Sequence, residues 1–193
     1  MAITYATWDS GNKGSGTTLS GGNLIATMPN GGTGGAYSTI SVSTGKWYWE
    51  LTCSSSGSVE PMNGVSDSSD SMSLCGATTH GYGYWGFNGQ KYHNGSGAAF
   101  GASYTTQVIG FALDADAGTL QVFKSNVSQG TITLSGVSTP YFAHCSDASG
   151  SANLVCTANF GATALTYTPP SGFNAGLYTG SAPSVNSNFL MFC

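Results

Sequence analysis

The sequence consists of short apolar runs separated by clusters of Gly, Ser, Asn and Asp, and no stretch carries apolar residues at helical spacing. Such runs, rich in β-branched and aromatic side chains and bounded by turn-forming residues, are typical of antiparallel β-sandwiches. Residues 46–51 show the alternation clearly, because Trp47 and Trp49 fall on one face of an extended strand and Tyr48 and Glu50 on the other. The sequence therefore predicts an all-β fold with essentially no helix.

The strongest hairpin signal lies between residues 108 and 123. Residues 108–113 form an apolar run, residues 114–118 supply turn formers, and residues 119–123 run back, with Gly118 free to take a positive φ. The Ser-rich segment 53–74 is predicted as a long loop interrupted by a short strand near residues 64–65. Further strands are expected at residues 24–27, 37–42, 131–134, 141–145, 154–160 and 164–167.

Composition excludes several classes of protein. The 193 residues suggest one domain with a sizeable core, and only 6% are charged, against about 25% in an average soluble protein. The net charge is −4 and the chain has no Arg, so the clustered cations of a nucleic-acid binder are missing. No apolar run approaches the roughly 18 residues of a spanning helix, and the first residues resemble no secretory signal. We expect a protein left in the cytoplasm where it is made, with no membrane insertion.

The cysteines fit neither a disulfide scaffold nor a zinc ribbon, because their number is odd and no Cys-x-x-Cys pair occurs. Cys145 and Cys156 have two interpretations: both are small buried side chains, which is the favoured one, or they face each other across a hairpin centred near Gly150, where a disulfide could form. The histidines show no zinc-like spacing, so no metal is predicted. The five cysteines are Cys53, Cys75, Cys145, Cys156 and Cys193.

No catalytic residue and no cofactor are predicted. No G-x-S-x-G nucleophile elbow occurs, and Asp114 and Asp116 sit in a predicted turn, where aspartates commonly bond their own backbone. Residues 81–86 match G-x-G-x-x-G, but the following residues 87–90 (FNGQ) cannot open the helix that a dinucleotide site needs. The sequence favours a protein that is not an enzyme.

One aromatic stretch is the candidate ligand site. Aromatic rings beside amide side chains suit sugar recognition, because ring faces stack on C–H surfaces while amides bond hydroxyls. The alternative is that Tyr84, Trp85 and Phe87 pack inside the sandwich. The candidate ligand-binding residues are Tyr82, Tyr84, Trp85, Tyr92 and His93.

The last twenty residues differ in character from the rest. Residues 174–193 are polar and then end in an apolar group, which in a monomer is unusual unless it docks on its own domain or on a partner. We therefore divide the chain into a sandwich domain at residues 1–173 and an extension at 174–193 that serves as an attachment arm. The candidate attachment residues are Phe189, Leu190, Met191 and Phe192.

Several motifs, in order, resemble the SPRY domain family. Residues 45–51 (GKWYWEL) resemble that family's GKWYWE strand, and residues 108–120 (VIGFALDADAGTL) its DVIGVALDxDxGTL hairpin. Residues 81–92 are similar to the region between them, and residues 159–161 (NFG) and 167–170 (YTPP) to its closing strand. The resemblance covers roughly residues 7–173, most of the chain.

The resemblance implies a bent, concanavalin-like jelly-roll sandwich that binds partners through loops at one edge and is generally not catalytic. The opening Thr7-Trp8-Asp9 and the many Gly and Ser residues resemble the SPRY-type modules of tailed-bacteriophage virion proteins. One departure is the turn at Lys124-Ser125-Asn126, which lacks the family's glycine, so Asn126 is expected to take a positive φ instead.

The resemblance leads to a functional expectation. We expect a non-enzymatic phage structural protein, a capsid decoration or head-fibre module that is assembled in the host cytoplasm and displayed on the virion surface. The main alternative is a tail-fibre adhesin that binds host-surface glycan or protein through edge loops, and a remote one is a polysaccharide depolymerase. The expected partners are other virion proteins, a host glycan and, for an oligomer, further copies of the chain.

Overall fold

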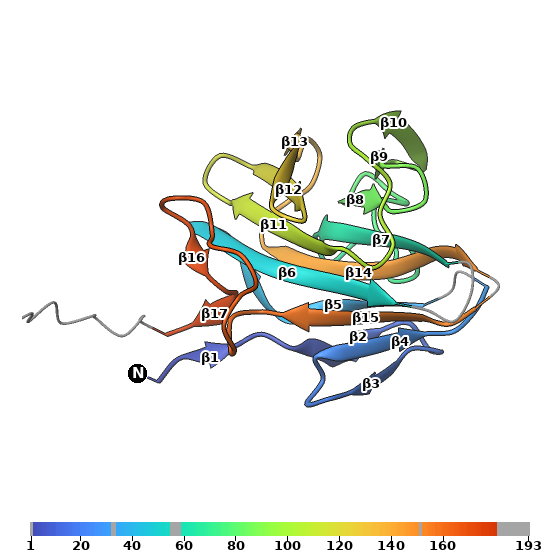
Figure 1. The fold of residues 1–193 in the computed structure, drawn as a ribbon, viewed down its shortest axis with the longest axis horizontal. Helices are drawn as coiled ribbons and strands as arrows, with labels where there is room; N and C mark the ends of the chain where they lie inside the picture. The colour runs from blue at the N-terminus through green and yellow to red at the C-terminus, as the bar shows by residue number, and fades with distance from the viewer. Residues whose placement is uncertain (1, 32–33, 55–58, 151, 181–193) are drawn as a thin grey trace, which may run out of the picture.

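Two antiparallel β-sheets packed face to face form the protein (Figure 1). The computed structural model describes residues 2–31, 34–54, 59–150 and 152–180. Those residues contain strands, turns and loops but no helix. The predicted all-β sandwich is therefore confirmed.

The first sheet has seven strands and the second eight, one of them off the main path. In spatial order the first contains β10 (Ser96–Ala99), β9 (Gln90–His93), β8 (Gly81–Trp85), β7 (Val59–Ser66), β14 (Tyr141–Gly150), β5 (Gly35–Val42) and β2 (Trp8–Lys13). The second contains β13 (Val127–Thr133), β12 (Thr119–Lys124), β11 (Val108–Asp114), β6 (Lys46–Ser54), β15 (Leu154–Asn159), β4 (Ile25–Met28) and β3 (Thr18–Ser20), with β16 (Asn174–Ala175) pairing with β6. A small sheet joins β1 (Thr4–Tyr5) to β17 (Tyr178–Thr179).

The inner face of β6 forms the centre of the core. Trp49, Leu51 and Cys53 alternate along it and are almost fully buried. The Trp49 ring stacks on the ring of Phe111 from β11, with 5.7 Å between their centroids. The alternation predicted for residues 46–51 is therefore confirmed.

The outer face of β6 is buried as well. Tyr48 and Glu50 are only 1% and 2% exposed, because the chain after β15 crosses over them. The Glu50 carboxylate accepts hydrogen bonds from the backbone N–H groups of Thr166 (2.7 Å) and Tyr167 (2.8 Å) and from the Tyr48 hydroxyl (3.2 Å). The strand predicted at residues 164–167 is therefore wrong, because the segment is a loop whose donors bond a side-chain carboxylate instead of a neighbouring strand.

The pairing of β14 and β15 also differs from the expectation. β14 pairs with β5 and β7, whereas β15 pairs with β4 and β6, so the two strands lie in different sheets. The alternative of a hairpin around Gly150 is therefore wrong, and the favoured interpretation is confirmed, because Cys145 and Cys156 are both buried free thiols that interact across the core. The strand expected near residues 64–65 is longer than predicted and spans all of β7.

The sandwich continues past its predicted end. β16 pairs with β6 at Trp47 and Tyr48, and β17 pairs with β1. The extension predicted from residue 174 therefore begins too early, since residues 174–179 belong to the fold. The predicted attachment residues Phe189, Leu190, Met191 and Phe192 lie outside the described residues.

The turn that lacks the family's glycine keeps its geometry by other means. Ser125 and Asn126 join β12 to β13 with φ values of 47° and 66°. Two successive positive φ values are what a tight hairpin turn of matching twist requires. The positive φ predicted for Asn126 is confirmed, and Ser125 shares the conformation.

Replacement of Glu50 tests the tie between β6 and the covering loop. Glu50→Gln leaves one carbonyl oxygen where two carboxylate oxygens accepted three bonds, so it should lower the free energy of unfolding by about 2 kcal/mol. Chemical denaturation measures the change. Glu60→Gln, at a half-buried position, is the matched control and should stay within about 0.5 kcal/mol of the wild type. Equal stability of the two variants would contradict the structural role of Glu50.

Candidate functional site: an edge groove beside Phe87

The structure separates the predicted aromatic residues into two groups. Tyr84 is fully buried, its hydroxyl donates to the Ala102 carbonyl, and its ring packs 4.8 Å from that of Tyr104. Tyr82 is 9% exposed and stacks on His93 at a centroid distance of 3.9 Å. Tyr84 therefore belongs to the core, and a ligand at the surface cannot reach its ring.

The other aromatic residues form a row that leads to the surface. Half-buried Trp85 contacts the rings of Tyr92 (5.7 Å) and Phe87 (6.0 Å). Phe87, which follows β8, is 61% exposed, so it belongs to neither the core nor the predicted ligand set. A large exposed ring next to a hollow is a common anchor for ligands.

The hollow is an open groove of about 520 Å³ beside Phe87, which we call the Phe87 groove. It lies where the end of β6, the start of β7, the end of β12 and the loops after β8 and β10 come together. Its size falls within the range of about 300–1,000 Å³ that is usual for small-molecule sites. The lining residues are Ser54, Val59, Gly86, Phe87, Ser103, Tyr104, Thr105, Thr106, Gln107 and Lys124.

Tyr104 fixes one wall of this groove. Its side chain is 2% exposed, and its hydroxyl donates to the Tyr84 carbonyl (2.8 Å) and accepts from the Asn63 side-chain amide (3.1 Å). Its backbone N–H bonds the Gly86 carbonyl at 2.8 Å, which joins the loop after β10 to the loop after β8. The two loops that carry Phe87 and the polar lining are therefore held together before a ligand binds.

The lining is chemically suited to binding. The exposed ring of Phe87 is accompanied by serine and threonine hydroxyls, and by the amide of Gln107, whose oxygen accepts from the Thr105 N–H at 2.8 Å. The Lys124 ammonium donates to the Ser103 carbonyl at 2.6 Å. No Asp or Glu is among these lining residues. Sequence reasoning missed residues 103–107 and Lys124, because a polar run between two strands looks like any loop.

The strands and loops that form the Phe87 groove lie within a segment that matches a known protein family. Residues 46–163 match the SPRY domain. This chain belongs to the SPRY domain family. The match covers β6 to β15 with the loop after it, and so includes all the strands and loops that form the Phe87 groove.

Three solved structures, two of them SPRY domains, share the fold at low sequence identity. The SPRY domain of human HERC1 has a TM-score of 0.66 at 19% identity, with 78% of this chain and 96% of that chain covered. The TRIM65 PSpry domain has a TM-score of 0.62 at 16% identity, with coverage of 81% and 92%. The stonustoxin structure has a TM-score of 0.61 at 22% identity over 81% of this chain, which spans 27% of that chain. A comparison with curated proteins finds no match.

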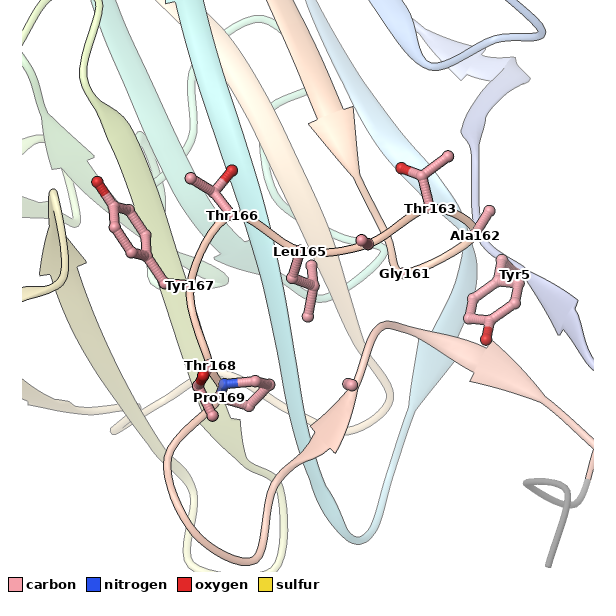
Figure 2. A pocket seen from close by; sticks show the side chains of 11 residues that line it. Tyr5, Gly161, Ala162, Thr163, Leu165, Thr166, Tyr167, Thr168 and Pro169 are labelled. Atoms are coloured by element: carbon pink, nitrogen blue, oxygen red, sulfur yellow. The ribbon is translucent and has the colours of Figure 1, made fainter. Parts of the chain in front are cut away.

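A second groove of this SPRY domain, of about 490 Å³, lies along the loop that Glu50 holds (Figure 2). Tyr5 stands at one end of it, and residues 161–169 with Ala175 form the rest. Its lining consists mainly of small residues and carries no charged side chain. The Phe87 groove offers a more varied set of contacts and is the better candidate.

Within the described ranges, no helix is long and apolar enough to cross a membrane.

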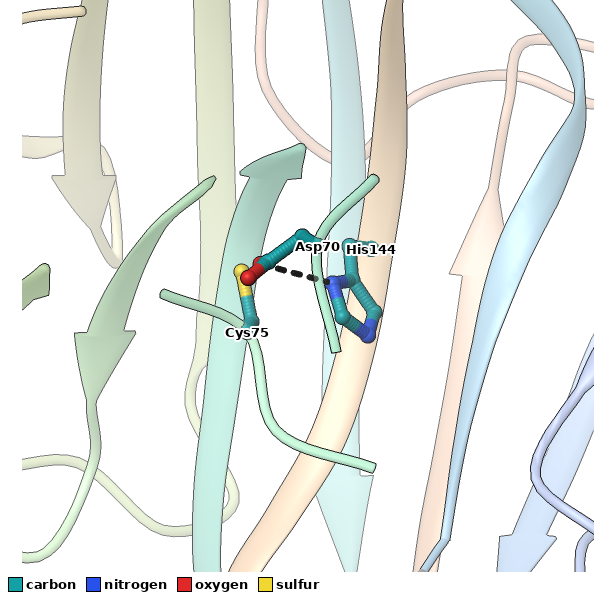
Figure 3. Close-up of side chains that lie close together, drawn as sticks. All are labelled: Asp70, Cys75 and His144. Atoms are coloured by element: carbon teal, nitrogen blue, oxygen red, sulfur yellow. Dashed lines mark ion pairs between the residues drawn. The ribbon is translucent and has the colours of Figure 1, made fainter. Parts of the chain in front are cut away.

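A buried cluster of Asp70, Cys75 and His144 has the residue types of a metal site (Figure 3). The space between them is taken by the Ser66 hydroxyl, which lies 2.8 Å from Asp70 Oδ2 and 2.9 Å from His144 Nδ1. Asp70 also accepts hydrogen bonds from the N–H of Gly76 (2.8 Å) and the hydroxyl of Thr78 (2.8 Å). Burial raises the pKa of the Cys75 thiol, so this sulfur is a poor ligand. The hydrogen bonding favours a structural role, in which the cluster fastens residues 67–80 to β7 and β14.

This cluster makes stability depend on pH. Burial lowers the pKa of His144 from 6.5 to about 4, against the opposing effects of the Asp70 carboxylate and the Met72 carbonyl. As the pH falls, His144 takes up a proton in the unfolded chain before it does so in the folded protein. The contribution of neutral His144 to the free energy of unfolding is therefore complete above pH 6.5 and is lost as the pH falls toward 4. The His144 contribution to that loss should be about 3 kcal/mol. Denaturation curves of the wild type and His144→Gln from pH 7 to 4 measure it, and parallel pH profiles would contradict the assignment.

Proposed function

We propose that this SPRY domain is a non-catalytic binding module of a tailed-bacteriophage particle, displayed on the virion surface, and that the Phe87 groove is where it binds. The observation that carries the proposal is the exposed ring of Phe87 beside a groove lined by hydroxyl and amide groups. Burying that ring against a ligand gains hydrophobic free energy, and the polar lining fixes the ligand's orientation. This arrangement supports recognition of a host-surface ligand.

The placement on a virion rests on the sequence resemblance to phage SPRY-type modules and on the low charge of the chain. Two places on the particle remain proposals. A decoration or head-fibre protein would grip the capsid through the predicted attachment residues at 189–192, whereas a fibre adhesin would use the groove. The groove favours the adhesin role, and the two roles are compatible in one protein.

Binding fits the groove better than hydrolysis. A glycoside hydrolase needs two carboxyl groups flanking the scissile bond, and the described residues that line the two grooves include no Asp or Glu. Glu50 is the buried carboxylate that could be considered for catalysis, but both of its oxygens already accept hydrogen bonds from backbone N–H groups and a hydroxyl. We therefore expect no cleavage of host polysaccharide by the purified protein.

Phe87→Ala tests the groove directly. Because Phe87 is 61% exposed, its removal should leave the melting temperature nearly unchanged while weakening binding to host cells at least about tenfold. Labelled protein titrated against cells measures the affinity. Val127→Ala is the matched control, because Val127 is 65% exposed and does not line the groove. Equal losses in both variants, or none in either, would contradict the groove as the binding site.

Copy number on the particle tests the placement. Mass spectrometry of purified virions gives the ratio of this chain to the major capsid protein. A ratio that fits a capsid lattice supports decoration, and a ratio that fits a few fibres supports the adhesin role. Absence of the chain from particles would overturn the virion proposal and leave the binding groove to be tested by itself.

A further inference from the structure

We propose that the ligand of the Phe87 groove is an acidic saccharide, whose carboxylate is bound by Lys124 and whose ring stacks on Phe87. This inference rests on the proposed binding function and specifies its ligand class. Three properties of the lining carry it, namely its charge, its hydroxyl content and its exposed ring.

The charge is the first property. The chain has only four cationic side chains for a net charge of −4, and one of the four lines this groove. Lys46 pairs with the Asp114 carboxylate at 2.9 Å, whereas Lys124 donates to a neutral acceptor, the Ser103 carbonyl, at 2.6 Å. An ammonium group has three donors, so Lys124 keeps donors for a ligand. Because none of the described lining residues carries a carboxylate, Lys124 makes the groove a positive site on a protein of net negative charge.

The hydroxyl content is the second property. Ser54, Ser103, Thr105 and Thr106 line the groove, and each hydroxyl both donates and accepts hydrogen bonds. Sugar hydroxyls are donors and acceptors in the same way, so such a lining pairs with them in several orientations. The Gln107 oxygen is already bonded to the Thr105 N–H, which leaves its NH₂ group as a donor to ligand oxygen atoms.

The exposed ring is the third property. Phe87 is 61% exposed, lines the groove, and contacts the Trp85 ring with 6.0 Å between the ring centroids. One ring beside a polar floor matches a pyranose, which has an apolar C–H face and a polar edge. An acidic peptide would gain more from several apolar side-chain pockets, and Val59 is the only aliphatic side chain larger than alanine among the described lining residues. The lining therefore favours a sugar acid over a peptide.

A charge-neutral variant tests the inference. Lys124→Gln keeps a donor for the Ser103 carbonyl and removes the positive charge, so the fold should be retained. Lys91→Gln, on β9 and away from the groove lining, is the matched control. The probes are uronic-acid oligosaccharides, neutral oligosaccharides of the same length and linkage, and an acidic peptide. Calorimetric titration at low and high salt measures each affinity.

The proposal requires one pattern of results. The wild type should bind the uronic-acid probes more tightly than the neutral ones, and this affinity should fall at high salt. Lys124→Gln should bind the uronic-acid probes about tenfold more weakly than Lys91→Gln does. Tighter binding of neutral sugars, binding of the acidic peptide alone, or indifference to Lys124→Gln would overturn the acidic-saccharide inference. If no probe binds while cell binding still depends on Phe87, the inference fails and the binding function stands. Loss of that dependence on Phe87 would overturn the proposed function itself.

Discussion

Burial of the central strand β6 on both faces is the constraint on which the rest of the structure depends. Its inner face supplies Trp49 and Leu51 to the core between the sheets, and its outer face is closed by the chain that follows β15. A carboxylate buried at this position is tolerable only because its oxygens accept hydrogen bonds from backbone and hydroxyl donors. Glu50 thus fastens the loop after β15 over the outer face of β6, and the chain continues from there into β16, which pairs with β6, and β17, which pairs with β1.

The candidate site shows how the opposite end of the sandwich is organised. Its residues come from segments far apart in the sequence, and the buried side chain of Tyr104 fastens the loop after β10 against the loop after β8. A further contact, from the Ala102 N–H to the Gln129 side chain at 2.9 Å, links this loop to β13. The lining of the groove therefore rests on a rigid frame, which reduces the entropy lost when a ligand binds.

Local patterns predicted the strands well and their partners less well. The alternation in β6 and the β11–β12 hairpin were predictable, because both depend on residues that are neighbours in sequence. The predicted strand at residues 164–167 was wrong because its backbone donors bond the carboxylate of Glu50, more than a hundred residues earlier in the chain. The possible hairpin between the strands of Cys145 and Cys156 was wrong, because each strand pairs with strands distant in sequence and the two belong to different sheets. Lys124 could not be predicted as a site residue, because the groove that it lines is formed by segments far apart in the sequence.

The buried thiols have a practical consequence. A thiol reagent needs access to the thiolate, so Cys53, Cys75, Cys145 and Cys156 can react only when the protein opens. Cys75 belongs to the segment 67–80 and its backbone N–H donates to the Ser146 hydroxyl of β14, while Cys53 and Cys156 oppose each other on β6 and β15 and Cys145 approaches from the other sheet. With Cys193 replaced by serine, the labelling rate of Cys75 would follow the lifting of one loop, and that of the other three would follow separation of the sheets. The buried cysteines therefore report separately on the opening rate of one loop and on the opening rate of the whole sandwich.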